Sequence, residues 1–419
     1  MMLDRRAFVS VLLGTAVAPM APRLAGATTQ AVEGTFAPWS PGMLDIHHID
    51  SGRGNATFIL APDGTTILVD CGASNDGSEV SAPARPDGSR RPGEWVAAYA
   101  LGHARAAGRD ALDYLLVTHI HPDHIGDVGP AAAGRMNGTY QLTGVSDVDR
   151  LMPAKVVLDR SYPDYGLLPP PAAPFTSNYL AWLDERRRTG REVARLDVGS
   201  DSQIELRSAS RYSDFVIRAL AGNGRIWNGA GTGSHSPFPD IASLAAADRP
   251  SENMLSLALR LSYGRFSYFT GGDLTSDTRD GRFPWMDVET PVARVAGRVE
   301  VAVANHHGYF DACGPDFVRL LDAQAYVIPT WHVSQPGQAQ IQRLLGAWPG
   351  VVRHDVFATE MLPGNRQLNE RFARQLRGTQ GHVVVRVAPG GDSYSIYVLD
   401  SSRELGSVTL KSGPYVCRS

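Results

Sequence analysis

Lysine, cysteine and long hydrophobic segments are scarce in this chain of 419 residues, and each scarcity argues against a class of protein. Lys155 and Lys411 are the only lysines, so arginine supplies almost all of the positive charge, and the formal net charge is -3. A chain without a basic excess does not favour a nucleic-acid partner, although one stays open. The charged fraction of 20% and the hydrophobic fraction of 43% are those of an ordinary folded protein.

Three cysteines, Cys71, Cys313 and Cys417, are too few for a disulfide framework. One bridge could form in an oxidising periplasm, and Cys313 with Cys417 is then the expected pair. Buried free thiols are the alternative interpretation of the same residues.

The first 27 residues have the pattern of a cleavable export signal. Arg5 and Arg6 precede an apolar run that ends near Met20, and small residues follow up to Ala27. The run is too short for a comfortable membrane span, and the small residues indicate cleavage after Ala27. The segment resembles a twin-arginine signal. We therefore expect a signal peptide at 1–27, a single domain with long loop insertions at 28–419, a periplasmic or secreted location, and no membrane contact after cleavage.

Short β-rich runs alternate with helical stretches in both halves of the chain. In the first half we expect strands at 44–50, 57–60, 66–70 and 113–118, and helices at 94–107 and 178–195. In the second half we expect strands at 215–221, 255–263, 266–270, 300–304, 325–328, 382–387 and 394–399, and helices at 315–321 and 338–347. The pattern predicts an α/β (α+β) protein with two similar halves and long loops at 74–93, 162–174 and 223–252.

The strongest chemical signal is the segment T-H-I-H-P-D-H at residues 118–124. It places His119, His121, Asp123 and His124 within six residues, directly after an apolar strand. Imidazole nitrogens and carboxylate oxygens are the ligands that zinc and similar cations prefer. His119 and His121 can point to one centre, while Asp123 and His124, one turn later, can point to a neighbouring one. A loop without metal has no reason to concentrate such ligands.

H-x-H-x-D-H after an apolar strand resembles the signature of the metallo-β-lactamase superfamily. T-I-L-V-D-C-G at 66–72, Y-F-T-G-G-D at 268–273 and N-H-H-G at 305–308 resemble its other motifs. The resemblance implies an αβ/βα four-layer sandwich in which Asp273 bridges two metals and Asp70 hydrogen-bonds the metal loop. The implied metal ligands are His119, His121, Asp123, His124, Asp273 and His307. The reverse assignment of His306 and His307 stays open.

A narrower likeness covers residues 46–308. The phrases H-H-I-D-S-G-R-G-N-A-T-F-I-L, E-N-M-L-S-L-A-L-R-L and N-H-H-G resemble the metallo-β-lactamase-like domain of bacterial competence DNA-uptake proteins and phosphorylcholine-esterase-like enzymes. Two residues depart from the pattern. Tyr309 stands where that branch has serine, and Asn253 stands where many members place a third histidine for the first metal. His235 is the nearest substitute for that histidine.

The resemblance implies an exported metal-dependent hydrolase that uses a zinc-activated water. Two zinc ions are expected, with manganese and iron as alternatives. Asp123 would hold metal and orient the water, while His306 and Tyr309 would stabilise negative charge or protonate the leaving group. The branch favours a small or medium anionic substrate that is a phosphoester or phosphodiester. The alternatives are a lactone, ester or β-lactam hydrolase and, less favoured, an iron-dependent redox enzyme or a non-catalytic binding protein.

The remaining histidines have plainer interpretations. His332 follows a predicted strand end and could line the pocket, and His103 fits a helix surface. Structural positions are expected for His47 or His48, for His354 and for His382.

Overall fold

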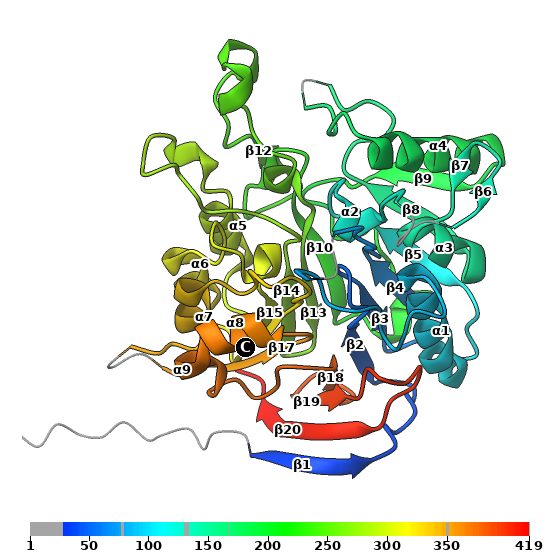
Figure 1. The fold of residues 1–419 in the computed structure, drawn as a ribbon, viewed down its shortest axis with the longest axis vertical. Coiled ribbons are helices and arrows are strands. Elements are labelled where there is room, and N and C mark those ends of the chain that lie inside the picture. Colours follow the sequence, from blue (N-terminus) through cyan, green and yellow to red (C-terminus); the bar gives the residue numbers. More distant parts are fainter. Residues whose placement is uncertain (1–27, 77–78, 130–133, 167, 349–351, 419) are drawn as a thin grey trace, which may run out of the picture.

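Two large β-sheets dominate the computed structural model, which describes residues 28–76, 79–129, 134–166, 168–348 and 352–418 (Figure 1). The predicted signal peptide, residues 1–27, lies outside the described residues. Within the described ranges, no helix is long and apolar enough to cross a membrane.

The ten-stranded sheet combines the first half of the chain with its last strands. In spatial order it contains β1 (Thr29–Gly34), β20 (Val408–Val416), β19 (Ser393–Leu399), β18 (His382–Val387), β2 (Leu44–His48), β3 (Thr57–Leu60), β4 (Thr66–Val69), β5 (Leu112–Leu116), β8 (Ala154–Asp159) and β9 (Glu192–Arg195). Strands β4, β5, β8 and β9 run parallel. The segments that follow β4 and β5 therefore leave the sheet at the same edge.

The eight-stranded sheet comes from the second half of the chain. In spatial order it contains β12 (Ser234–His235), β11 (Arg225–Trp227), β10 (Phe215–Gly222), β13 (Ala258–Tyr263), β14 (Phe266–Thr270), β15 (Val301–Val303), β16 (Ala325–Ile328) and β17 (Asp355–Ala358). Strands β14 to β17 run parallel, so the segments after β14 and β15 also share an edge. A separate hairpin pairs β6 (Met136–Asn137) with β7 (Tyr140–Gln141).

The main core lies between the two sheets. Ile46 and Ile67 of one sheet and Leu259 and Val301 of the other belong to a single buried cluster. Alternate residues of the same strands face outward and pack against the helices on each side. The ten-stranded sheet is covered by helices α1 (Pro92–Ala104), α3 (Gly144–Leu151) and α4 (Pro174–Arg188) (Figure 1). The eight-stranded sheet is covered by α5 (Glu289–Ala296), α6 (Pro315–Leu321), α7 (Gln338–Leu344) and α9 (Glu370–Ala373). Helix α8 (Pro363–Leu368) directly precedes α9. These four layers confirm the predicted αβ/βα sandwich.

The clearest error in the predicted elements is the single helix at 178–195. Helix α4 ends at Arg188, and residues 192–195 form β9 instead. Gly190, with φ of 76°, allows the chain to reverse between them. Arg186 of this helix is buried, and its Nη1 atom lies 2.6 Å from Asp149 Oδ1. Strands β1, β8, β17 and β20 were not predicted.

The predicted pairing of Cys313 with Cys417 is wrong for this structure. Both residues and Cys71 are free and buried. Cys313 lies in the cluster beneath helices α5 and α6, whereas Cys417 lies in the core between the sheets. Burial raises the pKa of the Cys417 thiol to about 12. The alternative interpretation, buried free thiols, is the observed one.

Candidate metal centre

The metal loop, residues 117–124, connects β5 to the short helix α2 (Pro122–Ile125) at the edge where β4 also ends. The amide of Leu257, from the opposite half, donates to the carbonyl of Thr118 at 2.9 Å and ties the loop to both sheets. Pro122 is the first residue of α2, a position at which a backbone N–H forms no hydrogen bond within the helix, so proline is tolerated there. The extended backbone of His121 therefore turns abruptly into the helix that carries Asp123 and His124.

A first ligand group contains His119, His121 and Asp273. His119 Nε2 lies 3.1 Å from His121 Nδ1 and 3.6 Å from Asp273 Oδ2. Zinc–nitrogen bonds of roughly 2.0–2.1 Å place tetrahedral ligand atoms roughly 3.3 Å apart. The observed separations are therefore close to those expected of atoms that share one ion.

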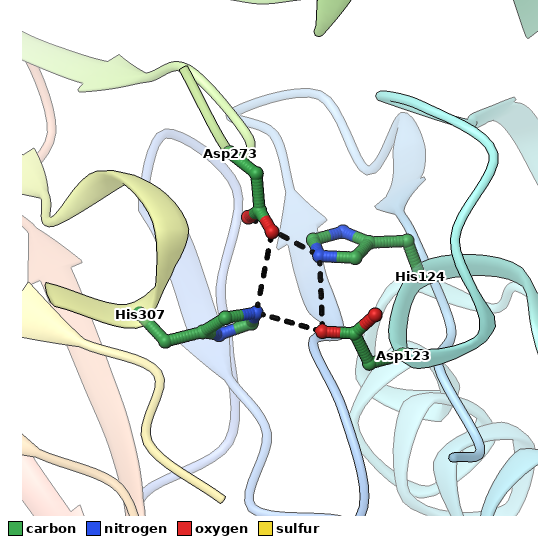
Figure 2. A group of neighbouring side chains, drawn as sticks. All are labelled: Asp123, His124, Asp273 and His307. Atoms are coloured by element: carbon green, nitrogen blue, oxygen red, sulfur yellow. Dashed lines mark hydrogen bonds and ion pairs between the residues drawn. The ribbon is translucent and has the colours of Figure 1, made fainter. Parts of the chain in front are cut away.

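A second ligand group contains Asp123, His124, Asp273 and His307, whose ligand atoms all lie within 4.8 Å of one another (Figure 2). His307 Nε2 lies 3.0 Å from Asp123 Oδ2, and His124 Nε2 lies 3.2 Å from Asp273 Oδ1. The Nε2 atom of His124 is buried and has no hydrogen-bond partner among the described residues. A buried lone pair beside two carboxylates is an arrangement that a cation would satisfy.

Asp273 belongs to both groups. Its Oδ2 atom faces His119 and His307, and its Oδ1 atom faces His124. Gly272, with φ of 54°, precedes it, and a Cβ at that glycine would lie 2.8 Å from the Cβ of Thr118. Glycine thus lets the turn after β14 approach the metal loop. The structure brings all six predicted metal ligands together at this point.

Outer hydrogen bonds fix the orientation of the second group. Asp70 Oδ1 accepts from the Thr118 amide at 2.7 Å, and Asp70 Oδ2 lies 2.8 Å from His124 Nδ1. The hydrogen bonds predicted between Asp70 and the metal loop are therefore present. His307 Nδ1 lies 2.8 Å from the carbonyl of Pro329. With Nδ1 occupied, each ring presents Nε2 to the carboxylates.

The N-H-H-G turn, Asn305–Gly308, holds two consecutive residues in a strained conformation. His306 and His307 have φ of 47° and 54°, in the left-handed region that costs a non-glycine residue about 1–3 kcal/mol. Glu289 stabilises the turn, because its Oε1 atom accepts hydrogen bonds from Asn305 Nδ2 and the Cys313 amide at 2.9 Å. Burial raises the pKa of Glu289 to about 7. Such strain is characteristic of functional sites.

Carboxylates and imidazoles balance one another's charge at the site. Burial alone would raise the pKa of Asp123 and Asp273, but nearby histidines, foremost His124, hold both pKa values well below their ordinary range. Burial alone would lower the pKa of His124, but its carboxylate neighbours, Asp273 foremost, hold it well above its usual value. The two acids therefore create a strong preference for positive charge between them.

His306 and Tyr309, the predicted proton donors, adjoin the ligand groups. His306 Nδ1 lies 2.6 Å from Asp311 Oδ1, and its Nε2 atom lies 3.3 Å from Asn253 Nδ2 and 3.8 Å from Asp273 Oδ2. Burial would lower the pKa of His306, but Asp273 and Asp311 raise it to about 9. The ring of Tyr309 packs edge-on at 5.2 Å from that of His306.

Two other histidines lie outside both groups. His235, the expected substitute ligand, is exposed in β12, where its Nδ1 atom lies 2.7 Å from Asn228 Oδ1, so it does not join either ligand group. The ring of Trp331 packs against both His332 and His307, at 5.4 Å and 6.1 Å. His332 is therefore one aromatic ring away from the second group.

Sequence reasoning missed a buried ion pair beneath the metal loop. Arg160 Nε and Nη2 donate to the two carboxylate oxygens of Glu252 at 2.8 Å each. Glu252 Oε1 also accepts from the Ile120 amide at 2.9 Å, so the pair supports the loop. The partners are 92 residues apart, and no local pattern joins them. Asp311 was missed for a different reason, because its role depends on the turn of the chain after Gly308.

Residues 49–138 match the model of the metallo-β-lactamase superfamily. The match shows a likeness to this superfamily over 90 of the 419 residues. The matched segment includes the metal loop, and Asp273 and His307 of the site lie beyond it. The match agrees with the predicted resemblance, and the second ligand group supports the prediction of a metal-dependent hydrolase.

Weaker likenesses were found among solved structures. A protein from Parabacteroides distasonis with the provisional name metal-dependent hydrolase is 11% identical, with 80% of this chain and 100% of that chain covered and a TM-score of 0.36. A protein of unknown function from Enterococcus faecalis is 12% identical, with 80% and 64% covered and a TM-score of 0.29. Similarity this weak establishes neither a common fold nor a shared activity. No curated protein matches this chain.

Proposed function

We propose that the protein is an exported hydrolase that holds two zinc ions and cleaves a small or medium phosphoester, a phosphodiester in particular. The observation that carries the proposal is the position of Asp273 between the two ligand groups, with Oδ2 3.6 Å from His119 Nε2 and Oδ1 3.2 Å from His124 Nε2. One carboxylate shared by two sets of nitrogen ligands suits a pair of neighbouring cations. Bound ions would act as Lewis acids and supply a water that ionises near neutral pH.

The chain's own groups would orient the attack and protonate the product. Asp123 and Asp273 have depressed pKa values, so both stay ionised at neutral pH and accept hydrogen bonds from the attacking water. Tyr309 lies beside the ligand groups, and its hydroxyl makes no hydrogen bond to the described residues. We assign Tyr309 to the protonation of the leaving group. Tyr309→Phe should then lower kcat and leave the metal content unchanged.

An arginine-lined cleft supports an anionic substrate. It has a volume of about 910 Å³ and contains Arg53, Arg85, Arg90 and Arg91. The last three are paired with carboxylates, whereas Arg53 forms no ion pair with any described residue and donates to the Asp76 carbonyl at 3.0 Å. Arg53 is two residues from Asn55, whose amide donates to the carbonyl of Asp123 at 2.8 Å. A cation without an acidic partner among the described residues, close in sequence to a residue that binds the metal loop, suits a phosphate oxygen.

The preference for phosphodiesters also rests on the resemblance of the N-H-H-G turn to the phosphorylcholine-esterase-like branch. The experiment is an assay of zinc- and manganese-loaded protein on bis-p-nitrophenyl phosphate, p-nitrophenyl phosphorylcholine, nitrocefin and a simple lactone. Phosphodiester cleavage that is abolished by chelation and restored by zinc supports the proposal. Turnover of nitrocefin or the lactone alone would overturn the substrate class and favour the lactone, ester or β-lactam alternative.

Export through the twin-arginine route is the second part of the proposal, and Arg5, Arg6 and the small residues before position 28 support it. Mass spectrometry of the mature protein should find an N-terminus at Thr28. Replacing both arginines by lysine should retain the precursor in the cell. A mature protein that begins at Met1 would contradict this part and leave the hydrolase assignment untouched.

A further inference from the structure

The first ligand group lacks the third nitrogen that its fold relatives use. His119 and His121 supply two nitrogens, and Asn253 occupies the position at which many members of the superfamily carry another histidine. Among the described residues, the Asn253 side chain forms no hydrogen bond with either of these histidines. Its Nδ2 atom lies 3.3 Å from His306 Nε2, and its Oδ1 atom is buried without a partner among the described residues. The side chain of Asn253 is therefore in contact with a different histidine.

That histidine is His306, which approaches Asp273, the acid shared by both groups, from the N-H-H-G turn. Its Nε2 atom lies 3.8 Å from Asp273 Oδ2, the same oxygen that lies 3.6 Å from His119 Nε2. Both separations are slightly longer than the roughly 3.3 Å expected between tetrahedral zinc ligands, so His306 and His119 are each close to the distance at which they could share an ion with this oxygen. The left-handed backbone of His306, with φ of 47°, directs the ring toward Asp273.

The carboxylate of Asp311 orients the His306 ring in the way expected of a metal ligand. Asp311 Oδ1 lies 2.6 Å from His306 Nδ1, so the Nδ1 proton is donated to Asp311 and the Nε2 lone pair faces the site. His124 with Asp70, and His307 with the Pro329 carbonyl, show the same arrangement. Asp311 is held in turn, because its carbonyl accepts from the Ser276 amide at 2.8 Å.

We propose that His306 Nε2 is the third nitrogen ligand of the first metal, in place of the histidine absent at Asn253, and that Asp311 is its positioning residue. This inference rests on the proposed two-metal function. It replaces the predicted role of His306 as a proton donor, because a nitrogen bound to metal has no proton to give. Protonation of the leaving group then falls to Tyr309.

The test is the titration of metal-free protein with cobalt(II), followed by equilibrium dialysis and by the visible absorption of the bound ions. Wild-type protein should bind two equivalents. His306→Ala should bind the first ion at least about 100-fold more weakly, and Asp311→Asn should weaken it by about 10- to 100-fold, the usual effect of an outer partner. His235→Ala, which removes an exposed histidine, should bind like wild type.

A rescue variant separates ligation from a general disturbance of the turn. Asn253→His combined with His306→Ala should restore the second equivalent of cobalt, because it returns a histidine to the usual position. Two equivalents with unchanged affinity and absorption in His306→Ala would overturn the inference and leave the two-metal proposal standing. Failure of folded wild-type protein to bind two ions would instead overturn the two-metal proposal itself.

Discussion

Nine of the twelve histidines fall into two groups, buried or half-buried, that differ in what their ring nitrogens face. The site histidines are His119, His121, His124, His306 and His307. The aromatic histidines are His47, His48, His103 and His382. In the first group, carboxylate oxygens lie 3.2 Å and 3.0 Å from the Nε2 atoms of His124 and His307. In the second group, the one such contact among the described residues is longer, 3.9 Å between His47 Nε2 and Asp45 Oδ2. In the second group, aromatic rings surround the imidazoles, and His47 and His103 are 4.5 Å apart.

The pKa values follow this difference. Burial lowers the pKa of His48 and of His382 to about 3 and that of His103 to about 4. Burial alone would also lower the pKa of His124, but Asp273, Asp123 and Asp70 reverse this effect and raise the pKa well above 6.5. A buried histidine therefore serves the fold when its neighbours are rings, and it is prepared for a cation when its neighbours are acids.

The largest expected effect comes from removing the shared acid. Asp273→Asn keeps the size of the side chain but removes the charge that both ligand groups share, so the protein should lose both metals and all hydrolytic activity. Metal analysis after dialysis checks this outcome. Asp287→Asn, at a half-buried acid that accepts from the Thr290 amide, is the control and should retain both metals. Retention of either ion by Asp273→Asn would show that the groups are independent.

A smaller loss is expected when only the outer support changes. Asn, like Asp, tolerates the φ of 60° at position 70, so Asp70→Asn should keep the backbone conformation. The substitution weakens the hydrogen bonds to His124 Nδ1 and to the Thr118 amide. Metal affinity should fall by about 10- to 100-fold. Competition with a zinc chelator measures the change. An unchanged affinity would mean that the metal loop keeps its form without this carboxylate.

The aromatic histidines should control acid stability rather than catalysis. The folded pKa of His48, about 3, lies below its ordinary value of 6.5, so its contribution is present above pH 6.5 and is lost as the pH falls toward 3. His48→Phe should remove this loss and recover about 2 kcal/mol of unfolding free energy at pH 5 relative to pH 7. Urea unfolding of metal-free protein at both pH values measures it, with the exposed His235→Phe as the control.

The smallest effect should appear at the cleft. Arg53→Ala should raise KM for a phosphodiester several-fold with little change in kcat, because the arginine would contact the substrate away from the reacting bond. Arg53→Lys keeps the positive charge, so its KM should lie between those of the wild type and Arg53→Ala. Equal KM values for all three proteins would remove Arg53 from substrate binding.

The sequence allowed much of this site to be predicted because its ligands are clustered. His119, His121, Asp123 and His124 occupy six positions after one strand, so the strand and the metal chemistry support each other. Strand β3, with the predicted bounds Thr57–Leu60, is an apolar run between turn residues. Strand β20 was missed because polar residues and a Gly-Pro pair interrupt its alternation.

What could not be predicted depends on the meeting of distant segments. The contact of Arg160 with Glu252 exists only because β8 and the segment before β13 meet beneath the metal loop. The partner of His306, Asp311, follows from the left-handed turn between them. Sequence spacing does not encode the direction of a side chain after such a turn, so the contacts of His306 with Asp311 and Asn253 could not be predicted.

Whether Asp273 joins two metal ions can be seen in a crystal structure of the zinc-loaded protein with diffraction data collected at the zinc absorption edge. We expect two anomalous peaks, each at roughly 2.0–2.2 Å from its ligand atoms, with Asp273 close enough to bind both ions. Peaks that Asp273 does not share, or a single peak in the presence of excess zinc at neutral pH, would contradict this expectation.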